Sequence, residues 1–172
     1  MKSVSCVLAA ALTLSACGVP DQNRFRPLME PERVQAVQPT DAFVNTFFRV
    51  CLDNAGRSST HRAAAMANGF SQLAMRSSDS FIANSDDGTQ ALVLIAELTG
   101  YRCSLDDLTR SKGAATIAAF RAAAQQAGAT PTTGGNLQIS VKPILNSGDV
   151  LFYDLKAVRG SGGLSLILEN QS

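Results

Sequence analysis

The spacing of apolar side chains predicts a helix over about 41–55. A stripe at helical spacing runs along this segment and consists of Phe43, Phe47, Val50 and Cys51, widened by Val44, Phe48 and Ala55. Thr40 is the expected N-cap, and Gly56 is a typical residue for ending a helix. We interpret the aromatic stripe as core packing rather than as the wall of a ligand site, with Cys51 on the buried side.

A second, short helix is expected to follow. Ser59 or Thr60 is its expected N-cap, and Gly69 after Asn68 supplies a left-handed turn. Its expected packing face consists of Ala63, Met66 and Ala67. His61 lies near the start of this polar segment, and we interpret it as a surface residue.

Near Leu73 the pattern changes to short apolar runs that predict strands. Segments 80–84 and 89–98 flank Asp87-Gly88, a typical hairpin signal, and 101–105 is the next expected strand. The almost continuous apolar run 91–96 fits a buried strand or a helix, and the turns on both sides favour a strand. Ser104 and Asp107 resemble a capping box that starts a turn or short helix.

The second half of the chain repeats this order of helix and strands. Residues 114–127 predict an alanine-rich helix that packs through Ile117, Phe120 and Ala124, and a Gly/Thr loop follows over 130–136. Alternating residues predict a strand at 137–142, and segments 150–158 and 164–169 predict a hairpin about the glycines at 160–163.

Together these elements predict an α+β fold with a mostly antiparallel sheet of about six strands and two to three packed helices. The expected order is α-α-β-β-β-α-β-β-β within a single domain, residues 40–172. The segments at 86–97 and 160–169 resemble each other, so an internal duplication is a further hypothesis.

The first residues have the pattern of an export signal. Lys2 precedes an apolar run over 7–14, which is far shorter than the roughly 20 residues of a membrane-spanning helix. The run ends in Leu14-Ser15-Ala16-Cys17, which resembles the lipobox of bacterial lipoproteins. The resemblance implies that residues 1–16 are a signal peptide and that Cys17 is lipidated. The alternative is a soluble secreted protein cleaved near Cys17.

The same resemblance implies a location. Gly18 is not the aspartate that retains lipoproteins at the inner membrane, so we expect an outer-membrane anchor with the domain facing the periplasm. Residues 17–39 are interpreted as a tether, because Pro20, Pro27, Pro31 and Pro39 interrupt any helix. The membrane is therefore one expected partner.

Composition argues against a nucleic-acid partner. The chain has 15 Lys and Arg and 14 Asp and Glu, and removal of Lys2 with the signal leaves 14 of each. A near-neutral domain lacks the basic surface that nucleic acids attract.

Export also bears on the cysteines. If Cys17 is lipidated, Cys51 and Cys103 remain in an oxidising compartment, and we predict a disulfide between them. The alternative is a pair of buried free thiols.

No residue pattern indicates catalysis, a metal or a cofactor. His61 is the single histidine, no Gly-x-Ser-x-Gly motif is present, and the glycines at 160–163 lack the lysine of a phosphate loop. A Cys51–His61 nucleophile pair is one alternative, in competition with the disulfide. Our leading hypothesis is a non-enzymatic protein-binding or envelope-assembly module. The alternatives are a binding module for a small apolar or lipid-like ligand and an envelope hydrolase.

Overall fold

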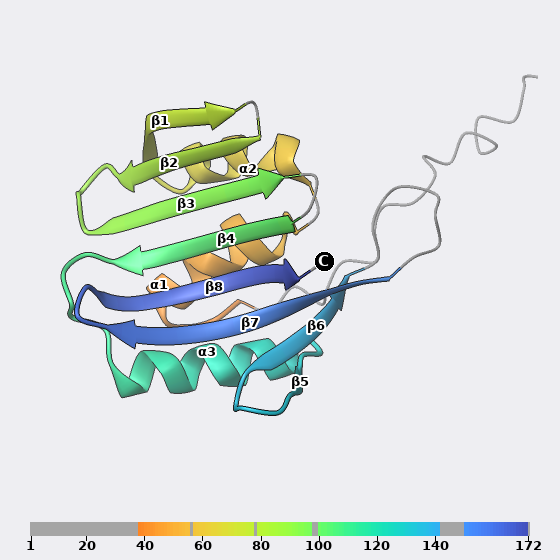
Figure 1. Ribbon diagram of the computed structural model, residues 1–172. Helices are drawn as coiled ribbons and strands as arrows, with labels where there is room; N and C mark the ends of the chain where they lie inside the picture. The colour runs from red at the N-terminus through yellow and green to blue at the C-terminus, as the bar shows by residue number, and fades with distance from the viewer. Residues whose placement is uncertain (1–37, 56, 78, 98–99, 142–149, 172) are drawn as a thin grey trace, which may run out of the picture. The chain divides into compact units, whose positions relative to one another are not determined.

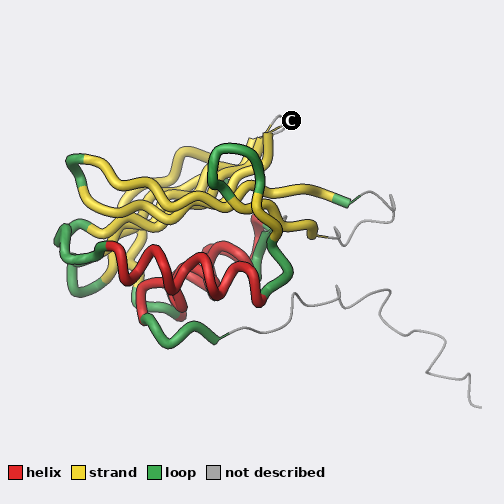
Figure 2. The backbone as a smooth tube through the Cα atoms, turned by 90° about the horizontal axis from the view of Figure 1, so that it is seen from below, coloured by secondary structure: helices red, strands yellow, loops and turns green. Residues whose placement is uncertain are grey.

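The computed structural model describes residues 38–171, apart from 56, 78, 98–99 and 142–149. The expected signal peptide, Cys17 and nearly all of the expected tether therefore lie outside the described residues. The described residues form one antiparallel sheet with helices packed against one of its faces (Figure 1 and Figure 2).

The described part of the chain contains three α-helices, one π-helical turn and eight strands. The helical segments are α1 (Ala42–Phe47), the π-helical turn η2 (Phe48–Leu52), α2 (Ser58–Ala67) and α3 (Ala114–Gln126). The strands are β1 (Phe70–Ser77), β2 (Ser80–Ser85), β3 (Gln90–Glu97), β4 (Gly100–Asp107), β5 (Thr130–Pro131), β6 (Leu137–Val141), β7 (Leu151–Gly160) and β8 (Gly163–Gln171).

The α+β class and the antiparallel sheet are confirmed, but the predicted strand number and order are wrong. Each half of the chain contributes four strands instead of three. The two additional strands are β1, most of whose described side chains are exposed, and β5, which has two residues and contains Pro131. Neither has the alternation of buried and exposed positions by which a half-buried strand is predicted.

The two halves of the chain meet in the middle of the sheet. The strand order is β1-β2-β3-β4-β8-β7-β6-β5, and every pairing is antiparallel. Each half is therefore a four-strand meander preceded by helix, and the last strands of the two halves, β4 and β8, pair with each other (Figure 1). This strand order agrees with an internal duplication, which stays a hypothesis.

Alternation along the central strands separates the two faces of the sheet. One set of side chains is buried against the helical layer, and it includes Leu92, Leu94, Cys103, Leu105, Leu166 and Leu168. The intervening side chains point to the opposite face, on which Figure 2 shows no helix. The core therefore lies between the sheet and the helices.

The first helix begins one residue later than expected, because Asp41 rather than Thr40 is its N-cap. The Asp41 carboxylate accepts hydrogen bonds from the backbone N–H of Phe43 at 3.0 Å and of Val44 at 3.1 Å. Its other oxygen accepts from the Thr116 hydroxyl at 3.2 Å, which joins α1 to α3. An aspartate binds these N–H groups and also complements the helix dipole.

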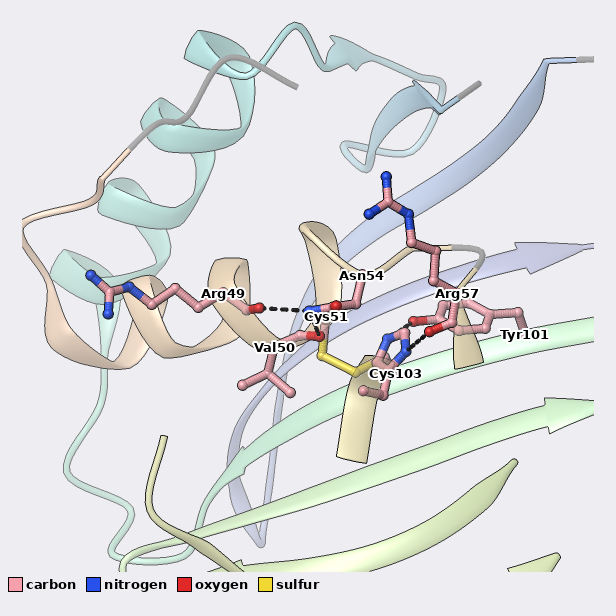
Figure 3. Close-up of a disulfide and its surroundings, with 8 residues drawn as sticks. Arg49, Val50, Cys51, Asn54, Arg57, Tyr101 and Cys103 are labelled. Carbon is pink, nitrogen blue, oxygen red and sulfur yellow. Dashed lines mark hydrogen bonds between the residues drawn. A yellow bond between two sulfur atoms is a disulfide. The ribbon is translucent and has the colours of Figure 1, made fainter. Parts of the chain in front are cut away.

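The predicted disulfide is present in the structure. Cys51 in η2 and Cys103 in β4 are bonded, with Cα atoms 5.6 Å apart (Figure 3). The helix that carries Cys51 widens to a π-helical turn, in which the Asp53 N–H donates to the Phe48 carbonyl at 2.9 Å. The Asn54 amide then donates to the carbonyls of Arg49 and Val50, at 2.8 and 3.1 Å. These bonds satisfy carbonyl groups at the end of the helical segment.

Residues Ser104 to Asp107 are strand, not the turn or short helix that the capping-box pattern predicted. All eight residues of β4 pair with β3, so the ladder takes precedence over the local cap. The Asp107 carboxylate instead accepts from the N–H of Thr109 at 3.1 Å and of Lys112 at 2.8 Å. Burial raises the pKa of Asp107, but a hydrogen bond from the Thr109 hydroxyl at 2.6 Å, together with these two backbone bonds, outweighs burial and holds that pKa below its usual value.

Candidate functional site

His61 is fully buried, so its assignment to the surface is wrong. The buried face of α2 is made by His61 and Ala65, one turn apart, at 0% and 2% exposure. The face expected to pack is exposed instead, with Met66 at 62%. Ala-rich helices offer small side chains on every face, so the histidine and its hydrogen bonds decide which face lies inward.

The hydrogen bonds of His61 define its tautomer. Nδ1 lies 2.8 Å from the Arg57 carbonyl oxygen, which can only accept, so Nδ1 carries the proton. Nε2 therefore accepts from the Tyr101 hydroxyl, at 2.5 Å. The Tyr101 ring also contacts the ring of Tyr153 edge to face, with centroids 5.5 Å apart. The histidine thus links the helical layer to two strands of the sheet.

The surroundings of His61 keep it neutral. Burial lowers its pKa from 6.5 to about 4, against the opposing effect of hydrogen bonds with the backbone of Arg57 and Cys51. Burial also raises the pKa of Tyr101 well above 10, with a further contribution from Tyr153. Neither side chain exchanges protons near neutral pH.

The predicted alternative of a Cys51–His61 nucleophile pair is not compatible with this geometry. The Cys51 sulfur is bonded to Cys103, and both cysteines have no exposed surface. A general base has to reach its substrate, and His61 has no exposed surface either. Both imidazole nitrogens are used in hydrogen bonds inside the fold, so this cluster stabilises the packing.

Asp87 and the glycines at 160–163 lie in turns between strands. Asp87 sits between β2 and β3, where its carboxylate accepts from the hydroxyls of Ser85 and Thr89 at 2.6 and 2.7 Å. These hydrogen bonds, that of Ser85 first, lower the pKa of Asp87 to about 2. The glycines at 160–163 connect β7 to β8. Within the described residues, no group of three or more His, Cys, Asp or Glu is arranged to hold a metal ion.

We call the face of the sheet opposite the described helices the open face (Figure 2). A row of facing residues crosses five strands of this open face, from Ile82 through Val93, Ser104 and Ile167 to Lys156. Apolar side chains therefore lie at the centre of the open face and a hydroxyl between them.

A second row beside it is charged. It runs from Ile95 through Arg102, Glu169 and Asp154 to Gln138. Lys156 joins the two rows, because its ammonium lies 2.5 Å from the Glu169 carboxylate and 3.8 Å from that of Asp154. Ion pairs of this kind hold their partners in fixed positions even when they contribute little to stability.

Strand β7 exposes a large apolar side chain on the open face toward each of its two ends. Phe152 is 57% exposed and Val158 is 48% exposed, while Tyr153 and Leu155 between them are buried on the helical side. The ion-paired Asp154 and Lys156 lie between these two side chains on the same face, and exposed apolar side chains beside paired charges are typical of protein-binding surfaces. The alternation along the chain predicts the 150–158 strand but not this surface, because alternation does not tell which exposed positions of separate strands become neighbours.

No helix in the described part of the chain has the length and apolar character needed to cross a lipid bilayer. A comparison of the chain with protein-family models, with curated proteins and with solved structures finds no match.

Proposed function

We propose that this protein is a lipid-anchored, non-enzymatic protein of the cell envelope whose folded domain binds another protein through the open face of its sheet. The anchor is inferred from the lipobox at Leu14-Ser15-Ala16-Cys17 and from the apolar run before it. An outer-membrane location facing the periplasm follows from Gly18, as the resemblance to lipoproteins implies.

The observation that carries protein binding is the exposure of two apolar side chains, Phe152 and Val158, on a sheet face that none of the described helices covers. The exposed Phe152 ring is large enough to act as an anchor residue in an interface. Lys156 and Glu169 beside it are already paired with each other, so a partner covers the pair without leaving a lone charge.

The anchor and the binding face need separate tests. For the anchor, cells that express the full chain are labelled with palmitate, and we expect label in the wild-type protein and none in Cys17→Ser. The substituted protein should also leave the membrane fraction. Unlabelled wild-type protein that fractionates as soluble would reject the lipid anchor and would leave the binding face untouched.

For the binding face, a photo-crosslinking residue replaces Ser140, which faces Phe152 across β6 and β7. The matched control carries the same residue at Gln125, an exposed position of α3 in the helical layer. We expect a discrete crosslinked product in cells from position 140 only, and we expect Phe152→Glu to abolish it while the melting temperature stays the same. Equal products from both positions, or an unchanged product with Phe152→Glu, would reject the open face as the binding surface.

A further inference from the structure

The two edges of the sheet differ in length. The β5 edge has two residues, one of which is Pro131, and proline has no N–H to donate. The opposite edge, β1, has eight residues, and no other described strand pairs with its outer side. Exposed strand edges of this length are templates for another strand.

Large apolar side chains are exposed on β1 and on the neighbouring helix α2. Leu73 is 61% exposed and Met75 is 49% exposed. Met66, on the outward face of α2 and 62% exposed, lies one turn from Arg62, whose guanidinium is 3.9 Å from the Met75 sulfur. We call Met66, Leu73 and Met75 the edge patch. Methionine side chains adapt to partners of irregular shape, which suits an interface.

The two ends of β1 carry opposite charges. Arg76 lies near one end and forms no ion pair with any other described residue. At the other end, the Ser71 hydroxyl donates to the carboxylate of Asp86, whose backbone N–H donates to the Gly69 carbonyl at 2.7 Å. One strand thus has a cation at one end and an anion held beside the other end.

Two register shifts interrupt the pairing of β1 with β2. They lie between Gln72 and Ala74 and between Met75 and Ser77, so Leu73 and Arg76 are additional residues with no partner in β2. A bulged residue departs from the regular alternation of a strand. The side chains of Leu73 and Arg76 are both exposed at this edge.

We propose that two copies of this chain form a dimer by antiparallel pairing of their β1 edges. A two-fold axis perpendicular to the sheet places Arg76 of each copy beside Asp86 of the other and brings the two edge patches together. Both helical layers then lie on the same side of one continuous sheet. This interface is separate from the open face, so it goes beyond the proposed function and does not depend on it.

The first test places a single reactive thiol at the centre of the proposed interface. Ala74→Cys in the full chain, in detergent extract, is treated with a short bis-maleimide, and Thr130→Cys at the β5 edge is the matched control, since both positions are exposed. The unsubstituted chain corrects for its own cysteines. We expect a covalent dimer with Ala74→Cys alone. No dimer, or the same yield from both edges, would overturn the proposal.

The second test exchanges the charges. Two identical ion pairs link the copies, so Arg76→Glu and Asp86→Arg should each weaken the dimer about tenfold in sedimentation, and the double substitution should restore it. Circular dichroism checks that each variant is folded. A dimer that Arg76→Glu leaves unchanged, or a double variant as weak as either single one, would overturn the proposed pairing. Loss of the crosslink at Ser140 would instead concern the open face.

Discussion

The Tyr101 hydroxyl donates a buried hydrogen bond to Nε2 of His61, and this bond joins the sheet to the helix that lies over it. Loss of the donor would leave a buried nitrogen without a partner, at a cost of about 1–3 kcal/mol. We therefore expect Tyr101→Phe to lower the free energy of unfolding by that amount in urea titrations.

A double-mutant cycle is the control for this bond. If the cost arises from the unsatisfied nitrogen, Tyr101→Phe should cost much less in a His61→Leu background than in the wild type. Equal costs in both backgrounds would show that the hydroxyl acts through other contacts.

The neutral state of His61 predicts a loss of stability in mild acid. Because burial holds its pKa at about 4 in the folded protein, against 6.5 when unfolded, only the unfolded chain gains this proton between those two pH values. The stabilisation of the folded protein that comes from neutral His61 is fully present above pH 6.5 and falls as the pH is lowered through this window. Below pH 4 the loss in the free energy of unfolding reaches about 3 kcal/mol. Urea midpoints at pH 7.5, 5.5 and 4.5 measure it.

His61→Gln is the control, because glutamine does not titrate. Its stability should change much less over the same window, although it is lower at neutral pH. Asp107 does not confuse the comparison, since hydrogen bonds hold its pKa below 3.8 and its stabilisation is lost only in stronger acid. A wild-type protein as stable at pH 4.5 as at pH 7.5 would contradict the buried neutral histidine.

His61 also shows where sequence reasoning reaches its limit. In α2 the alanines make every face equally able to pack, so periodicity did not indicate the buried side. The inward face depends on a hydroxyl 40 residues away, on Tyr101, which no local pattern reveals. By contrast, the large apolar side chains of the first helical segment lie on one side of its axis. The buried positions of Phe43, Phe47 and Cys51 were therefore predicted correctly.

Some strands were predicted from the sequence and others were not, for similar reasons. The β2–β3 hairpin and the β7–β8 hairpin have apolar strands and glycine turns, and both were predicted. Strand β1 was missed as a separate element because its described side chains from Ser71 to Ser77 are exposed, which removes the alternation. The pairing of β4 with β8 joins positions 59 to 71 residues apart in the chain and follows from tertiary packing.

The Cys51–Cys103 disulfide is expected to contribute substantially to the free energy of unfolding. It closes a loop with a sequence separation of 52 residues, so its removal should cost about 2–4 kcal/mol. We expect the Cys51→Ala/Cys103→Ala double variant to unfold at correspondingly lower urea concentration. Wild-type protein unfolded in urea with reductant should refold with the same reduced stability.

Thiol labelling gives an independent measurement of the bond. In the wild type, whose Cys17 thiol is occupied by the proposed lipid, unreduced and unfolded mature protein should label at neither Cys51 nor Cys103, and reduced protein should label at both. Labelling of both cysteines without reductant would show that the bond does not form in cells.

Gly163 begins β8 in direct contact with the end of β4. Its φ is +125°, and a Cβ added there would lie 2.2 Å from the backbone carbonyl oxygen of Asp107. Gly163→Ala therefore requires both a strained backbone and a shift of the Asp107 segment, which we expect to cost about 1–3 kcal/mol or more. Gly162→Ala is the matched control in the same turn, since a Cβ there meets nothing within 4 Å.

Thermal melts of the Gly163→Ala and Gly162→Ala variants should differ by several degrees, with Gly163→Ala the lower. Equal melting temperatures would show that the turn moves away from β4 without loss, and the close contact between the two halves of the chain would then contribute nothing to stability.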